Sequence, residues 1–156
     1  MTPFQSLKPM GLRQHMKERE ALPDADHVAH HCKGSEIDEG VVLSSAFELR
    51  HATDTRPEET ELSVNWLEFF KKAERAAAVD EIRKIIQLEL KASARFAVFN
   101  VGSVRKQIND NPDIPNKIDV LYMPEDDDPS HAGVVGYVVD DLDVAAELAL
   151  LDIELF

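Results

Sequence analysis

Apolar runs along the chain predict a set of short strands. Residues 41–47 are β-branched and aromatic and lie between polar segments, a pattern typical of a strand. Residues 95–101 form an almost continuous apolar run, which predicts a buried strand. Residues 118–123 and 131–139 flank an acidic turn and predict a hairpin with a long tip. Residues 27–32 are expected to pair with the first of these strands through a glycine-containing loop.

Helical spacing of apolar residues predicts helices between and after these strands. One helix is expected to begin near Trp66 and a second near Asp80, which can act as its cap. A short helix is expected after Gly102, and Asp140 or Asp141 can cap a final helix. The expected buried faces of the first two helices consist of Trp66, Phe69, Phe70 and Ala73 and of Ile82, Ile85, Ile86 and Leu90.

The order of these elements predicts an α+β fold. Strand runs and helix runs are segregated rather than alternating, which favours a single mixed, mainly antiparallel sheet with helices packed mostly on one face. Residues 1–26 contain early prolines and no sustained period, so they are expected to form a partly ordered leader. Residues 27–156 are then expected to form a single domain, whose core is large enough to fold unaided.

The charge of the chain is strongly acidic and unevenly placed. Thirty acidic and seventeen basic residues give a net charge of −13, which disfavours generic nucleic-acid binding. Residues 71–106 nevertheless carry a net charge of +5, whereas residues 110–156 carry −12. This asymmetry favours docking of a protein partner, one encoded in the same operon being a candidate. A merely solubilising acidic face is the alternative interpretation.

Cysteine usage and hydropathy indicate the compartment. The single cysteine excludes an intramolecular disulfide, and no apolar run approaches the roughly 20 residues that span a bilayer. The first ten residues lack the apolar core of a secretory signal. We therefore expect a cytoplasmic protein that does not enter a membrane, and the sequence leaves its oligomeric state open.

Three of the six histidines and the only cysteine lie within residues 27–32. Imidazole and thiolate bind transition metals, and imidazole transfers protons near neutral pH. His27, His30 and Cys32 are therefore candidate zinc ligands, although no second Cys/His pair completes a structural site. In a strand, His30 and Cys32 share one face while His27 and His31 share the other. Ordinary strand histidines are the alternative, and zinc is the one cofactor suggested.

A second candidate site combines His27, His30 or His31 with His131 as general acid and base, with His30 and His31 the preferred partners. His131 stands at a predicted strand start, where the small neighbours Ala132 and Gly133 can admit a ligand. Such an enzyme would act on a nucleotide or an RNA phosphodiester. The phosphate would be held by a weak anion site at the start of the short helix, made of Ser103, Arg105 and Lys106.

Three short motifs resemble a pattern of small uncharacterised bacterial proteins. They are His30-His31, Ser45-Ala-Phe47 and Leu62-Ser-Val64, within residues 27–68, and residues 129–132 are also similar. The His-His pair replaces an Arg-His pair of that pattern. The resemblance implies a bacterial origin and no activity.

Three functions follow from these features, in order of preference. The first is an accessory or protein-interaction domain that acts through its asymmetric charged surface. The second is the small histidine-dependent enzyme, and the third is a metal-binding protein that uses residues 27–32.

Overall fold

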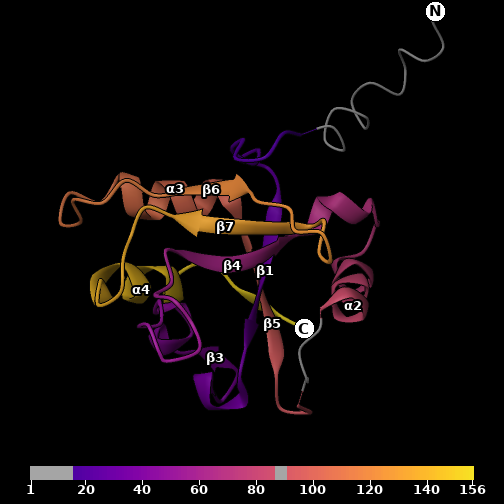
Figure 1. Ribbon diagram of the computed structural model, residues 1–156, viewed down its shortest axis with the longest axis horizontal. Coiled ribbons are helices and arrows are strands. Elements are labelled where there is room, and N and C mark those ends of the chain that lie inside the picture. Colours follow the sequence, from indigo (N-terminus) through magenta and orange to yellow (C-terminus); the bar gives the residue numbers. More distant parts are fainter. Residues whose placement is uncertain (1–15, 87–90) are drawn as a thin grey trace, which may run out of the picture.

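A six-stranded antiparallel sheet forms the centre of the computed structural model, which describes residues 16–86 and 91–156 (Figure 1). The strands follow one another across the sheet in the order β6-β7-β4-β1-β5-β8. All neighbouring pairs are antiparallel. In chain order the six strands are β1 (His27–Cys32), β4 (Glu61–Trp66), β5 (Arg95–Asn100), β6 (Asp119–Tyr122), β7 (His131–Val135) and β8 (Glu154–Leu155).

Three α-helices and several shorter elements surround the sheet within the described residues. The helices are α2 (Arg75–Ile85), α3 (Val101–Asn109) and α4 (Leu142–Ala149). A small hairpin is formed by β2 (Ile37–Asp38) and β3 (Val41–Val42). Single 3-10 turns are η2 (Gly34–Glu36), η3 (Ser44–Phe47) and η4 (Leu67–Phe70). These elements confirm the α+β fold, and no described helix has the length and apolar character required to cross a bilayer.

The sheet separates two apolar cores because successive side chains of a strand point to opposite faces. Val28 and Cys32 of β1 face the main core, which also contains buried residues of η3, α3 and α4. Ala29, between them, faces a smaller core that α2 and η4 cover. Two of the three α-helices described therefore pack on one face, as expected, and α2 packs on the other.

Strands β1 and β4 pair over only part of their length. Val28 is opposite Trp66 and Ala29 is opposite Asn65, and no further pair joins these two strands. On its other side, β1 pairs with β5 from His27 to Cys32. Strand β4 runs steeply across β1 in Figure 1, so the two strands diverge beyond Ala29. This divergence creates a fork that η2, the small hairpin and η3 border.

The local predictions hold where a sequence pattern is continuous. Strand β5, helix α3, the β6–β7 hairpin and helix α4 all form near their predicted positions, although β7 ends at Val135, before Gly136 with its φ of 111°, and not at residue 139. Residues 27–32 do form a strand, but it pairs with β4 and β5 instead of with residues 41–47. The predicted strand over 41–47 is wrong after Val42, because the chain turns into η3 and buries Ala46 and Phe47.

The helix predicted from Trp66 is also wrong. Trp66 is the last residue of β4, and its indole Nε1 donates a hydrogen bond of 2.8 Å to the buried carboxylate of Asp26. The aromatic residues after it lie in η4, which ends at Lys71 with a φ of 53°. Tertiary pairing of β4 with β1 and β7 thus overrides a spacing that also suits a helix.

Helix α2 begins before the predicted cap. It starts at Arg75, after Glu74, so Asp80 lies within the helix. The alanines of residues 76–78 favour helix and extend it toward the N-terminus. Its buried face contains Ala78, Val79 and Ile82, whereas the predicted Leu90 lies outside the described residues.

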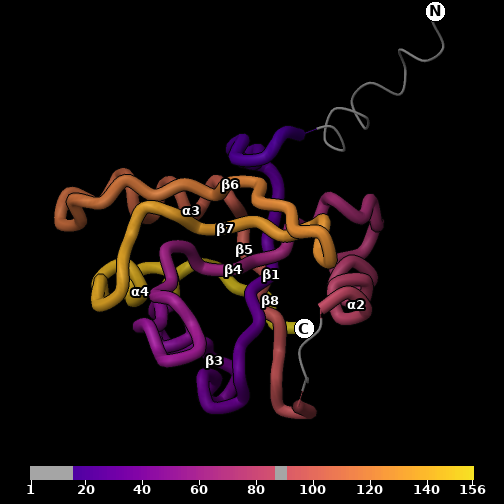
Figure 2. The backbone as a smooth tube through the Cα atoms, in the orientation of Figure 1, coloured from indigo at the N-terminus to yellow at the C-terminus, as the bar shows by residue number. Residues whose placement is uncertain are grey.

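The described part of the predicted leader is built into the fold. Leu22 is 1% exposed and belongs to the main core. Residues 19–22 run along the outer edge of β6 (Figure 2), where the amide of Leu22 donates to the carbonyl of Val120. Arg105 of α3 donates a further hydrogen bond of 2.6 Å to the carbonyl of Leu22. This segment therefore covers an edge strand that would otherwise expose unpaired backbone groups.

Candidate functional site

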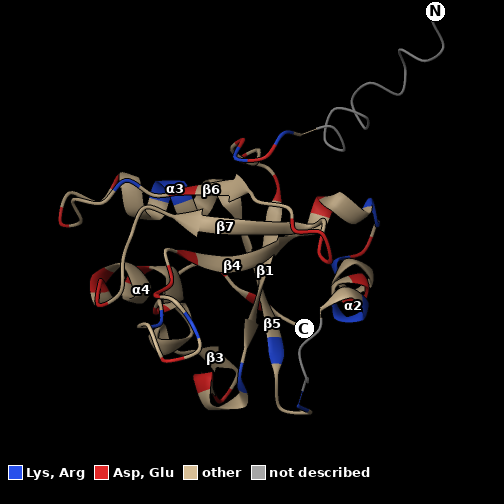
Figure 3. Cartoon of the chain, viewed as in Figure 1, with Lys and Arg blue, Asp and Glu red and all other residues tan. Residues whose placement is uncertain are grey.

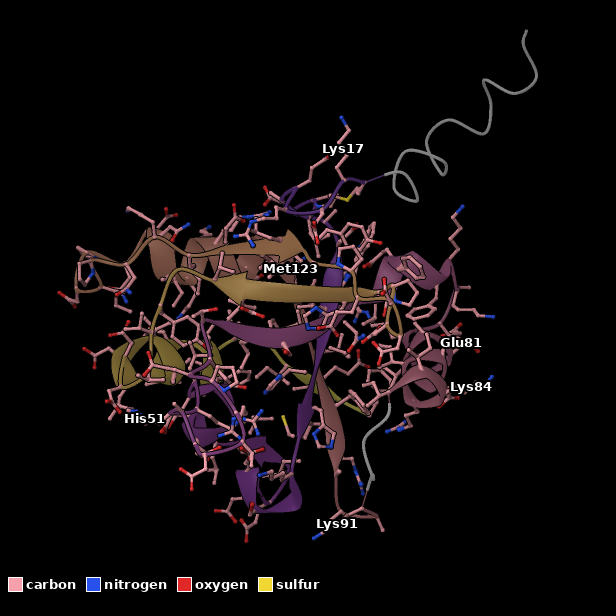
Figure 4. The ribbon with its side chains drawn as sticks, in the orientation of Figure 1. Lys17, His51, Glu81, Lys84, Lys91 and Met123 are labelled. Atoms are coloured by element: carbon pink, nitrogen blue, oxygen red, sulfur yellow. The ribbon has the colours of Figure 1, made fainter. Side chains whose placement is uncertain are left out.

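A pocket of about 790 Å³ occupies the fork between β1 and β4. Its walls come from β1, η2, η3, the segment that follows η3, the start of β4 and residues 91–94. Figure 4 shows Lys91 at the lower tip of the molecule, beneath the fork. Two of the candidate residues, His30 and His31, line this pocket.

His30 contacts both sides of the fork. Its Nδ1 lies 2.9 Å from the carbonyl oxygen of Ser63 on β4, and its Nε2 lies 2.7 Å from that of Ala46 in η3. A carbonyl oxygen only accepts hydrogen bonds, so a ring that bonds both must donate from both nitrogens. His30 also lies 5.5 Å from Phe47, measured between ring centroids.

His31 points to the opposite face of β1. Its ring lies edge to face with Phe96, at 5.6 Å between centroids. Its Nε2 is enclosed and has no hydrogen-bond partner. Burial lowers the pKa of His31, and the neighbouring His30 lowers it further. His31 therefore favours its neutral form near neutral pH.

Cys32 is buried beneath the pocket. Its Sγ donates a hydrogen bond of 3.6 Å to the carbonyl of His30. Burial raises the pKa of the thiol to about 12, with the nearby carboxylate of Glu36 adding to the effect. The thiolate is the form that attacks electrophiles and binds metals. The surroundings of Cys32 therefore favour its inert, protonated form.

His27 lies apart from the other two candidate zinc ligands. Its Nδ1 is 2.9 Å from a carboxylate oxygen of Glu68, and its Nε2 accepts a hydrogen bond of 3.0 Å from Arg75. His30 and Cys32 extend from the other face of β1. The structure does not bring these three side chains together, and within residues 16–86 and 91–156 no cluster of three metal-binding side chains occurs.

His131 is held outside the pocket. It lies on β7, opposite Asn65 of β4, so one strand separates it from β1. Its Nδ1 lies 2.8 Å from the carbonyl oxygen of Met123, and its side chain is buried. His131 does not line the pocket that holds His30 and His31. The expected pair of acid and base is therefore not assembled there.

At the start of α3, donor groups of the predicted anion site already form hydrogen bonds within the protein. Arg105 donates to the carboxylates of Asp24 and Asp119, and the backbone amide and hydroxyl of Ser103 both donate to Asn100. Lys106 is exposed. Arg105 thus joins the N-terminal segment to β6, and its guanidinium is engaged.

Other charged groups of the pocket could not be anticipated from sequence spacing. Arg50 donates to Glu59 through Nε at 3.0 Å, through Nη2 at 2.8 Å and through its backbone amide at 2.7 Å. Burial would raise the pKa of Glu59, but the hydrogen bonds from Arg50 outweigh it and lower that pKa. Lys33 and Lys91 line the same pocket. These residues come from distant segments and form no local motif.

Comparisons of the chain with protein-family models, with curated proteins and with solved structures find no match. The resemblance to small bacterial proteins therefore stays a prediction. The chemistry of the pocket is inferred from its own residues.

Replacing His31 with glutamine is expected to weaken the dependence of stability on pH. The pKa of His31 lies below its usual value of 6.5 in the folded chain, so the unfolded chain binds more protons as the pH falls below that value. The contribution of His31 to the free energy of unfolding is therefore present above its usual pKa of 6.5 and is lost as the pH falls toward the lowered pKa. Urea unfolding from about pH 7 to about pH 5 should show a larger loss for the wild type than for His31→Gln.

His51 provides a control of opposite sign. Its hydrogen bond of 2.9 Å to Asp140 raises its pKa, so its contribution is present at low pH and lost as the pH rises. His51→Gln should therefore leave the acid-side loss unchanged or increase it. Equal acid-side slopes for the wild type and His31→Gln would contradict the assignment.

Proposed function

We propose that this protein is a binding domain that holds a small polar molecule in the pocket between β1 and β4. The observation that carries the proposal is the fork itself, where two central strands separate and His30 joins both sides of the gap. Central strands of a sheet ordinarily pair along their length, because unpaired backbone groups are costly to bury. A maintained gap at this position is best explained by a ligand that uses it.

The dimensions and walls of the pocket suit a small ligand. Its volume of about 790 Å³ falls within the range of roughly 300 to 1,000 Å³ that is usual for such sites. Ala46, Leu49 and Leu62 supply apolar contacts. Hydroxyl and charged groups supply polar ones, including those of Ser45, Arg50, Glu59 and Ser93.

Binding is favoured over catalysis by the state of the reactive side chains. Both nitrogens of His30 lie within hydrogen-bond distance of carbonyls, and the environment of Cys32 keeps its thiol protonated. A general base needs a free lone pair within reach of its substrate. His31 has a neutral ring, but the expected partner His131 lies outside the pocket. The enzyme hypothesis is accordingly ranked below binding.

A bulky side chain in the pocket tests this proposal. Ser45 is exposed, lines the pocket and lies outside the main sheet, so Ser45→Trp should fill space without disturbing the core. The control is Lys106→Trp, at an exposed position of α3 that does not line the pocket. Ligand-observed NMR with a panel of amino acids, organic acids, sugars and nucleotides should detect a ligand that binds the wild type and the control. Ser45→Trp should weaken its binding at least about tenfold.

Two outcomes would contradict the proposal. One is that no member of the panel binds the wild type. The other is that binding persists unchanged in Ser45→Trp while its amide spectrum shows a folded protein.

A protein-interaction role is the second candidate function. Near the start and end of α4, Val138, Leu142 and Leu150 are 57%, 56% and 70% exposed. Figure 3 shows acidic residues along the same helix, and Asp140 and Asp143 border a shallow hollow of about 270 Å³ beside Leu142. Exposed apolar groups with an acidic rim suit a partner with a basic surface.

This second candidate includes a bacterial cytoplasmic location and a partner encoded in the same operon. A single cysteine suits a reducing compartment, and the sequence resemblance implies the origin. Leu142→Asp should abolish capture of an operon-encoded partner by the purified protein, whereas Lys106→Asp should not. Equal capture by both variants, or capture by neither the wild type nor the control, would contradict this role.

A further inference from the structure

One end of the pocket brings two lysines together from distant parts of the chain. Gly34 packs directly against Ser93, since a Cβ placed on Gly34 would lie only 2.4 Å from the hydroxyl oxygen of Ser93. Lys33 precedes Gly34, and Lys91 lies two residues before Ser93. Both lysines line the pocket. The close approach of the two segments therefore brings Lys33 and Lys91 to the same end of the pocket.

Among the described residues, this end carries two ammonium groups against one carboxylate, that of Glu36. Neither Lys33 nor Lys91 has an ion pair there, and both residues are exposed. Glu36, an acidic residue of the pocket wall, accepts a hydrogen bond of 2.8 Å from the backbone amide of Lys33. This bond holds the Glu36 carboxylate at the start of η2.

The remaining carboxylates of the pocket lie on another wall. Glu59 precedes β4 and is bound by Arg50, so its charge is already matched. Glu48 follows η3 and is exposed. The end with Lys33, Lys91 and Glu36 thus carries one more positive than negative charge, and the wall with Glu48 and Glu59 offers hydrogen-bond acceptors.

We propose that the ligand of this pocket is an organic anion whose carboxylate or phosphate lies between Lys33 and Lys91. This inference rests on the proposed binding function and names its ligand class. Lysine ammonium groups act as flexible point charges and accept either kind of anion. The hydroxyl groups of Ser35 and Ser93 lie in the same wall and can donate to it. The chain carries a net charge of −13, so an anion needs this local positive end to bind.

Titration of the full, isotope-labelled chain with inorganic phosphate and separately with citrate tests the ligand class. Saturable shifts are expected at the backbone amides of Gly34, Ser35 and Ser93. Replacing both lysines, as Lys33→Gln with Lys91→Gln, should raise the dissociation constant at least about fivefold, and added salt should do the same. The control Lys72→Gln removes an exposed lysine outside the pocket and should leave binding unchanged. Stronger binding of phosphate or of citrate identifies which anion the site prefers.

Failure of this inference is distinguishable from failure of the binding function. Absence of saturable shifts at these amides, or equal affinity in the double lysine variant, would overturn the anion assignment. A neutral or cationic ligand that depends on Ser45 would overturn it too, while supporting the binding function. Only the absence of any ligand dependent on Ser45 would overturn the binding function.

Discussion

The pair of hydrogen bonds made by His30 is the interaction on which the pocket depends. Where β1 and β4 separate, the carbonyl of Ser63 loses its partner in the sheet, and the carbonyl of Ala46 lies near the end of η3. One imidazole reaches both. The bond to Ala46 is partly buried and the bond to Ser63 is exposed, and an intramolecular hydrogen bond contributes about 0.5–1.5 kcal/mol net, so one side chain stabilises the contact of three segments. The fork can then remain open to a ligand while its inner edge stays fixed.

Several positive charges of this acidic chain are also used to join segments, through pairs with carboxylates. Arg50 is bound to Glu59, Arg105 to Asp24 and Asp119, and Arg75 to Glu154. These arginines hold distant segments together and so do not form an anion-binding surface. Lys33 and Lys91 differ because they lack such pairs within the described residues and lie beside a pocket. The proposed anion site therefore depends on where unpaired positive charge lies, more than on its total amount.

Sequence patterns identify the elements whose structure is decided locally. The apolar run of β5, the short helix α3 and the β6–β7 hairpin are all predicted from neighbouring residues, although the cap of α3 at Asn100 is not. The segments at 41–47 and 66–70 are mispredicted because their conformation is decided by distant partners. Trp66, for example, ends a strand that pairs with β1 and β7. The histidine cluster draws attention to His30 and His31, which line the pocket, but the lysines and the Arg50–Glu59 pair meet only in the folded chain.

The most direct test of the role of His30 is amide hydrogen exchange in His30→Ala, with His51→Ala as the control. Loss of the two hydrogen bonds should speed exchange about tenfold in residues 44–50 and 62–64, because roughly 1–3 kcal/mol of local stability is removed by losing both. Exchange in β6 and at the β6-facing amides of β7 should remain at the wild-type rate, as it should throughout the control. Unchanged exchange in residues 44–50, or an equal increase across the whole sheet, would show that His30 does not hold the fork.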